Sequence, residues 1–83
     1  MSTYQISEEE SMRIENYFRY HAPLEGQQEK YEQIRKLAKE FALSLLNLCP
    51  PSRERSVALT ELETSVMWAN ASIARNEKPQ ENK

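Results

Sequence analysis

Two adjacent prolines, Pro50 and Pro51, divide the chain between two long segments of helical periodicity. Proline lacks a backbone N–H and its ring clashes with the preceding turn, so a helix must end before them. Apolar side chains recur at spacings of three and four over residues 27–48 and again over residues 52–76, as in amphipathic helices. Because the connection is so short, the two helices are predicted to form an antiparallel hairpin.

The apolar residues of the two segments define the seam along which the helices should pack. The expected seam residues are Tyr31, Ile34, Ala38, Phe41, Leu45 and Leu48 on the first helix of the hairpin, and Leu59, Leu62, Val66, Ala69 and Ile73 on the second. Ser52, directly after the prolines, offers an N-cap for the second helix.

A shorter helix is expected at the N-terminal side of the hairpin, at about residues 7–20. Ser7 and Glu10 have the spacing of a capping box, and a following segment with Pro23 and Gly26 breaks the helical pattern. Strand signals are nearly missing, and the polar tail, residues 77–83, is expected to be disordered. The sequence therefore predicts one all-α domain over residues 1–83, with a short N-terminal helix and an antiparallel hairpin of two long helices.

The last helix carries more apolar surface than a hairpin can bury. A second row, Val57, Met67, Ala71 and Ala74, lies about a quarter-turn from the seam, with Trp68 beside it. The short first helix could cover part of this surplus with Ile14, Tyr17 and Phe18, giving a monomeric three-helix bundle. Since 83 residues rarely bury a helix on all sides, we expect a homo-oligomer instead.

Composition excludes several classes of protein. The net charge is -2, which argues against a protein that coats DNA or RNA through many phosphate contacts. The single Cys49 cannot form an internal disulfide, and one Cys with one His cannot build a zinc site within one protomer. No long uncharged apolar run predicts a membrane span, and the acidic stretch SEEES at 7–11 does not resemble a signal peptide.

The hairpin register brings polar and aromatic side chains to the end away from Pro50. If the turn lies there, residue i pairs with roughly residue 101 minus i. The residues expected to gather at this end are Tyr20, His21, Lys30, Tyr31, Asn70 and Arg75, with Arg35 about one turn further along. Aromatic rings stack on bases, guanidinium groups bind phosphate, and amides read base edges, so this set is suited to a nucleotide.

Each of these residues also has a purely structural interpretation. Tyr31 lies on the seam, and Trp68 belongs to a core or an interface. His21 can bond a carbonyl at the end of the preceding helix, and Arg75 is favoured electrostatically near a helix C-terminus. Lysines and arginines of the first long helix can form a solvated face with neighbouring glutamates. The residues of that face are Lys30, Arg35, Lys36 and Lys39, with Glu29, Glu32 and Glu40.

Catalysis is not expected. Cys49 and His21 lie at opposite ends of a helix of roughly 22 residues, about 33 Å long, and cannot form a nucleophile–base pair within one protomer. The sequence has no Glu-x-x-His pair and no Gly-rich phosphate loop, and no cofactor is expected.

Several stretches in a fixed order resemble a known family. They are YFRYHAP at 17–23, Gln27, KY at 30–31, IR at 34–35, Ala38, CP at 49–50, SRE at 52–54, ALTELE at 58–63 and MWANASIAR at 67–75. These stretches resemble small phage anti-CBASS proteins that act as sponges for cyclic oligonucleotides.

This resemblance implies an all-helical homohexamer that works in the cytoplasm of the infected bacterial host. It would sequester, without cleaving them, the second messengers that activate CBASS effectors. Cyclic dinucleotides would bind in pockets between protomers, and cyclic trinucleotides would occupy a separate set of sites. The alternatives are a helical protein–protein interaction module without a nucleotide ligand and a cyclic-nucleotide hydrolase.

The resemblance also implies roles for individual residues. Tyr20 matches a tyrosine that stacks on a base, and Arg35, or alternatively Lys36, matches a basic residue that meets phosphate. His21 and Pro23 would shape the pocket wall. Arg75 matches an arginine of the trinucleotide-type site.

Overall fold

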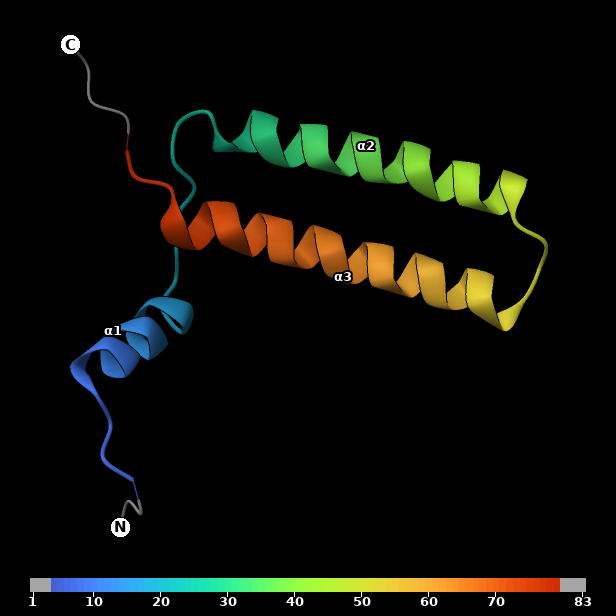
Figure 1. The fold of residues 1–83 in the computed structure, drawn as a ribbon. Coiled ribbons are helices and arrows are strands. Elements are labelled where there is room, and N and C mark those ends of the chain that lie inside the picture. The colour runs from blue at the N-terminus through green and yellow to red at the C-terminus, as the bar shows by residue number, and fades with distance from the viewer. Residues whose placement is uncertain (1–3, 80–83) are drawn as a thin grey trace.

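Three helices make up the computed structural model, which describes residues 4–79. They are α1 (Glu8–Tyr17), α2 (Gln27–Leu48) and α3 (Arg53–Asn76), and the described residues contain no strand. Figure 1 shows α2 and α3 side by side as an antiparallel hairpin, with α1 beyond the open end of that hairpin. The all-α fold with a helical hairpin is therefore confirmed.

Helix α1 begins with the predicted capping box. The Ser7 hydroxyl accepts a hydrogen bond from the Glu10 amide at 3.1 Å, and the Glu10 carboxylate accepts one from the Ser7 amide at 3.0 Å. The hydrogen bond from the Ser7 backbone is the main cause of a lowered pKa of the Glu10 carboxyl, and the hydrogen bond from the Ser7 side chain lowers it further. The helix start is thus fixed by residues that the sequence identifies.

The end of α1 differs from the sequence prediction, because the helix stops at Tyr17 and not at residue 20. In a longer helix, the Tyr20 amide would bond the Asn16 carbonyl. Here the His21 imidazole forms a hydrogen bond with that backbone carbonyl, and its Nε2 atom lies 2.8 Å from the Asn16 oxygen. The carbonyl is therefore satisfied without another helical turn, and the chain leaves in an extended form.

The turn between α2 and α3 is held by Ser52 and Arg55. The Ser52 hydroxyl caps α3 by accepting from the Arg55 amide at 3.0 Å, and it donates to the Pro50 carbonyl at 3.1 Å. The Arg55 guanidinium donates to the carbonyls of Leu46 and Cys49 at 3.3 and 3.2 Å. One side chain of α3 thus satisfies carbonyls at the C-terminal end of α2.

The seam of the hairpin agrees with the predicted pattern on α3 and departs from it on α2. The half-buried apolar residues along the seam are Tyr31, Ile34, Ala38, Ala42 and Leu45 on α2, and Leu59, Leu62, Val66, Ala69 and Ile73 on α3. Phe41 and Leu48 were expected there but are 56% and 77% exposed. Ala42 replaces Phe41, which lies about 100° away around the helix, because a small residue allows close helix packing.

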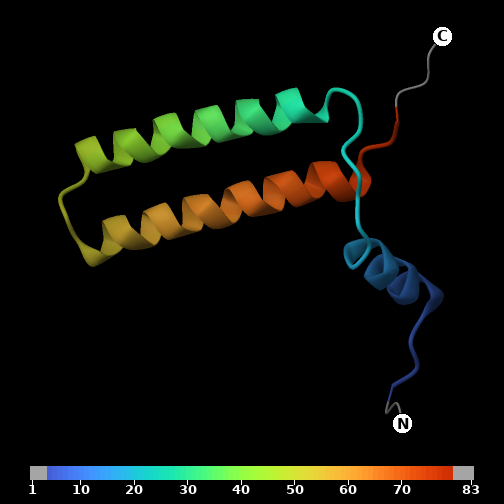
Figure 2. The same cartoon turned by 180° about the vertical axis from the view of Figure 1, so that it is seen from behind.

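The hairpin buries no apolar side chain completely. Among the described residues only Gln27 is buried, and Met67 and Trp68 are 62% and 66% exposed. Phe18 and Ile14, which could have covered this surface, are themselves 84% and 53% exposed. The monomeric three-helix bundle considered from the sequence is therefore not formed, as Figure 2 shows from behind.

The dimensions of the chain lead to the same conclusion. Its radius of gyration is 17.9 Å, and its extents along the three principal axes are 49, 47 and 16 Å. A compact chain of this length would have a radius of gyration of about 12 Å. The described chain is thus flat and open.

The tail that was predicted to be disordered begins at Glu77, directly after α3. Glu77 accepts hydrogen bonds from Gln27 and Lys30. Residues 80–83 of that tail lie outside the described residues. None of the three helices within residues 4–79 has the long apolar run that a bilayer crossing requires.

Candidate functional site

A groove of about 450 Å³ lies at the open end of the hairpin, and we call it the end groove. Its first wall is the segment that follows α1, and its second wall is the C-terminal end of α3 with the residues after it. The lining residues are Arg19, Tyr20, His21, Ala22 and Leu24 on the first wall, and Ala74, Arg75, Asn76, Glu77, Lys78 and Pro79 on the second. The groove therefore exists because the end of α3 lies beside the α1–α2 connection (Figure 1).

The first wall is fastened to α3 through Asn16 and Tyr17. The side-chain amide of Asn16 donates to the backbone carbonyl of Arg75 at 3.2 Å. The backbone carbonyl of Asn16 forms a hydrogen bond with the His21 imidazole. The Arg75 guanidinium lies over the Tyr17 ring, 4.4 Å from its centroid, in a cation–π contact. These contacts leave His21 and Arg75 on opposite walls of the same groove.

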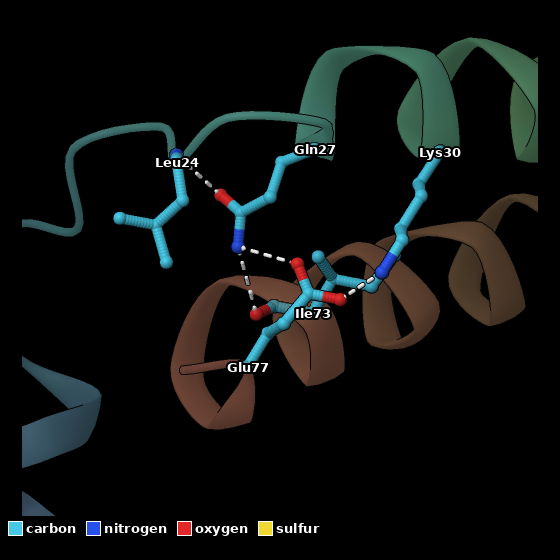
Figure 3. A network of polar contacts seen from close by, with 5 residues as sticks. All are labelled: Leu24, Gln27, Lys30, Ile73 and Glu77. Carbon is cyan, nitrogen blue, oxygen red and sulfur yellow. Dashed lines mark hydrogen bonds and ion pairs between the residues drawn. The ribbon is translucent and has the colours of Figure 1, made fainter. Parts of the chain in front are cut away.

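The second wall is fastened to α2 through Gln27, as Figure 3 shows. The Gln27 amide nitrogen lies 3.1 Å from the Glu77 carboxylate and 3.5 Å from the Ile73 carbonyl. Lys30 forms an ion pair with the other oxygen of Glu77. The hydrogen bond from Lys30 is the main cause of a lowered pKa of the Glu77 carboxyl, and the hydrogen bond from Gln27 lowers it further.

The chemistry of the end groove suits an anion with an aromatic ring. Arg19, Arg75 and Lys78 line it with a single carboxylate, that of Glu77, which Lys30 already pairs. The Tyr20 ring is 83% exposed in the connecting segment, so its face is available for stacking. Among residues 4–79 no group of three or more His, Cys, Asp or Glu side chains is placed to hold a metal ion.

The structure brings together only some of the residues that the sequence singled out. Tyr20, His21 and Arg75 line the end groove. Pro23 lies between Ala22 and Leu24, which are both in the lining, and it fixes the backbone of the first wall.

Arg35 lies apart from these residues. It lines a second groove of about 410 Å³ along the hairpin, which we call the side groove. The side groove is lined by Arg35, Ala38, Lys39, Ala42, Leu62, Glu63, Val66 and Met67. Arg35 is eight positions beyond Gln27, or about 12 Å along α2. Lys36 is exposed on the face of α2 that points away from the seam.

The cations of α2 were expected to form a solvated face with neighbouring glutamates, and the structure shows no ion pair between them within residues 4–79. Within residues 4–79 the one ion pair joins Lys30 to Glu77, which follows α3, and not to a glutamate of α2. Arg35, Lys36 and Lys39 are all exposed. Their charges thus remain uncompensated by contacts within the described chain.

Two further residues of the predicted polar cluster belong to the seam. Tyr31 is half-buried between the helices, in agreement with its predicted place on the seam. The side-chain oxygen of Asn70 is buried and has no hydrogen-bond partner among the described residues. Sequence reasoning missed Asn16 and Glu77, because a single Asn in a short helix and a Glu in a polar tail carry no distinctive pattern.

Comparison with known proteins adds one finding to this geometry. A family model described as "Acb2/Tad1, hairpin domain" matches residues 10–74, which include the whole of α2, α1 without its first two residues and α3 without its last two. No curated protein and no solved structure gives a significant match. The match spans well over half of the chain and covers the hairpin together with the first wall of the end groove. The chain therefore belongs to the Acb2/Tad1 family of anti-CBASS sponges, whose members bind cyclic oligonucleotides.

Proposed function

We propose that this protein is a phage sponge that binds and sequesters cyclic dinucleotides without cleaving them. In the cytoplasm of the infected host it would keep these messengers from activating CBASS effectors. The observation that carries the proposal is the exposed Tyr20 ring in the end groove of a chain of this family, with the exposed Arg35 in a second groove.

The recognition chemistry follows from the ligand. A cyclic dinucleotide carries two bases and two phosphates, so a two-fold interface can present the same residues to each half. Tyr20 would stack on a base, with His21 and Pro23 shaping the wall, and Arg35 would bind a phosphate. Stacking contributes about 1–3 kcal/mol per base, and nanomolar binding corresponds to about -12 kcal/mol. Two stacked bases and ion-paired hydrogen bonds to phosphate supply much of this total.

Such a site requires more than one protomer. Tyr20 and Arg35 line different grooves of one chain, so a ligand that touches both would lie between Tyr20 of one copy and Arg35 of another. Exposed apolar side chains supply the surface for such contacts. The largest of them on the hairpin are Leu37, Phe41, Leu43, Leu48, Met67 and Trp68. We propose a homohexamer, as the resemblance implies.

A separate site for cyclic trinucleotides is proposed around Arg75. Arg75 is half-buried, its guanidinium lies over the Tyr17 ring, and it lines a small cavity of about 220 Å³ together with Trp68. The cation–π contact holds the guanidinium in place before a ligand arrives, which lowers the ordering cost of binding a phosphate.

Titration calorimetry with a panel of cyclic dinucleotides, including cyclic GMP–AMP, tests the proposal. Wild-type protein should bind, whereas Tyr20→Ala and Arg35→Ala should each abolish detectable binding without changing the assembly. Lys36→Ala is the matched control on α2, because it removes a neighbouring exposed cation that lies about 100° further around the helix, on the side away from the seam. Loss of binding in Lys36→Ala but not in Arg35→Ala would transfer the phosphate role to Lys36.

Ligand recovery tests the absence of chemistry. After incubation and heat release, chromatography should return the cyclic dinucleotide unchanged. A linear product that appears only with folded protein would instead identify a hydrolase.

The exposed apolar surface also supports a second candidate function, a helical module that binds another protein. A thermal shift separates the two, because only a ligand that binds the folded state raises the melting temperature. No shift with any cyclic dinucleotide or trinucleotide would favour the interaction module.

A further inference from the structure

Gln27 is the one buried residue of the described chain, with 2% of its surface exposed. It is polar, while no apolar side chain of residues 4–79 reaches this degree of burial. A buried amide is stable only if its donors and acceptors have partners, because an unpaired one costs about 1–3 kcal/mol. The contacts of this residue therefore have a specific structural purpose.

The partners of Gln27 fix the orientation of its side chain. Its carbonyl oxygen accepts from the Leu24 amide at 2.8 Å, and its NH2 group donates to the Ile73 carbonyl and the Glu77 carboxylate. Rotating the amide by half a turn would set the oxygen against two acceptors and the NH2 group against a donor. Only one orientation satisfies all three partners, and Figure 3 shows these bonds with Lys30 on the far side of Glu77.

Two of these partners belong to the two walls of the end groove. Leu24 ends the first wall, and Glu77 lies within the second, directly after α3. A neighbouring cavity of about 370 Å³, lined in part by Gly26 and Lys30, also shares Leu24 and Glu77. The Gln27 contacts thus lie at the partition between the two cavities and tie one wall to the other.

Glu77 also affects the charge of the groove. An unpaired carboxylate beside a phosphate would repel it, whereas Lys30 neutralises this one from outside the groove lining. The same contacts that hold the wall therefore keep the groove suited to an anion.

We propose that Gln27 and Glu77 are positioning residues for ligand binding in the end groove. Their contact holds the segment that carries Tyr20 and His21 at a fixed spacing from the end of α3 that carries Arg75. This inference rests on the proposed function for the identity of the ligand, a cyclic dinucleotide or trinucleotide. Gln27 itself acts from outside the groove lining.

The test replaces the Gln27 amide with a carboxylate of nearly equal size. In Gln27→Glu the new carboxylate faces the Glu77 carboxylate and the Ile73 carbonyl with no hydrogen to donate. Affinity for the tightest cyclic nucleotide of the panel should fall at least about tenfold. Gln28→Glu is the matched control, since it makes the same change on an exposed neighbour in the same helical turn, and it should bind like wild type.

The double variant Q27E/E77Q separates positioning from general damage to the fold. Its introduced amide at position 77 can donate to the carboxylate at position 27, which restores the contact with donor and acceptor exchanged. Binding should return to within about threefold of wild type. Wild-type affinity in Gln27→Glu, or no recovery in the double variant, would overturn the proposal.

A measurement without ligand keeps this inference distinguishable from the proposed function. The backbone amide resonances of Leu24 and Glu77 should shift in Gln27→Glu and return toward their wild-type positions in Q27E/E77Q. If wild type binds no cyclic nucleotide, the proposed function fails, and with it the ligand part of this inference. If these resonances do not move, the wall contact itself is refuted.

Discussion

Replacing Trp68 by alanine should weaken the assembly strongly. Trp68 is 66% exposed in the single chain, and a tryptophan side chain has a surface of about 250 Å². Burial of that exposed part against another copy would remove about 165 Å² from water, worth about 4 kcal/mol at about 25 cal/mol per Å². The dissociation constant of a contact that buries Trp68 should therefore rise by about three orders of magnitude in Trp68→Ala.

Sedimentation velocity over a concentration series measures this change. Wild type should sediment as one assembled species at concentrations where Trp68→Ala is partly dissociated, while circular dichroism shows unchanged helix content. Lys36→Ala serves as the control, because this exposed cation adds no apolar surface to an interface. Trp68 is also the chain's single tryptophan, so its emission spectrum reports its surroundings directly.

Two results would refute this reasoning. The first is an unchanged sedimentation profile in Trp68→Ala across the whole concentration series. The second is a water-exposed emission spectrum in the assembled wild type, which would place Trp68 outside every interface.

Three further predictions concern the contacts that fix α1 and the end groove. Ser7→Ala removes the N-cap of α1 and should lower the stability of that helix by about 1 kcal/mol. Backbone amides of α1 should then exchange about fivefold faster, and unchanged exchange would contradict the prediction. Lys30 holds the pKa of the Glu77 carboxyl below its ordinary value of 4.5. The contacts of ionised Glu77 therefore stabilise the folded chain at neutral pH, and this stabilisation is lost as the pH falls through the lowered pKa. The difference in melting temperature between wild type and Glu77→Gln should accordingly shrink below pH 4.5, and a constant difference would argue against the pairing. Tyr17→Leu removes the ring under Arg75 and should loosen α1 by about 0.5–1 kcal/mol, seen in the same exchange experiment; no change would show that the cation–π contact adds nothing.

The hairpin was predictable because its signals are local. Pro50 and Pro51 end one helix, Ser52 caps the next, and the spacing of apolar residues gives the facing sides. The choice between Phe41 and Ala42 for the seam was not predictable from hydrophobicity, since the larger residue is the more apolar one. Packing distance decides it, and a distance between helices is a property of the tertiary structure.

The end of α1 and the end groove depended on side-chain contacts that the spacing of apolar residues does not encode. The sequence placed Tyr20, His21 and Arg75 at one end of the hairpin, and the register that predicts this also brings Gln27 beside Ile73. A bond from His21 to a carbonyl at the end of the preceding helix was one interpretation of the sequence, but its consequence, a helix that ends at Tyr17, was not predicted. Side-chain bonds to a backbone carbonyl leave no periodic pattern in the sequence.

The proposed dinucleotide site would span more than one copy of the chain. Arg35 lies in the side groove, and its relation to Tyr20 depends on how copies of the chain pack. That packing follows from the shape of two exposed surfaces and not from the spacing of residues along one helix.

Native mass spectrometry of the protein with a cyclic dinucleotide tests the central proposal most directly, because one spectrum reports assembly, binding and ligand integrity. A homohexameric sponge should give a species of six 9.8 kDa chains that carries added mass equal to whole, unhydrolysed cyclic dinucleotides. A spectrum of single chains without ligand, or of assemblies that carry ligand increased by the mass of water, would contradict it.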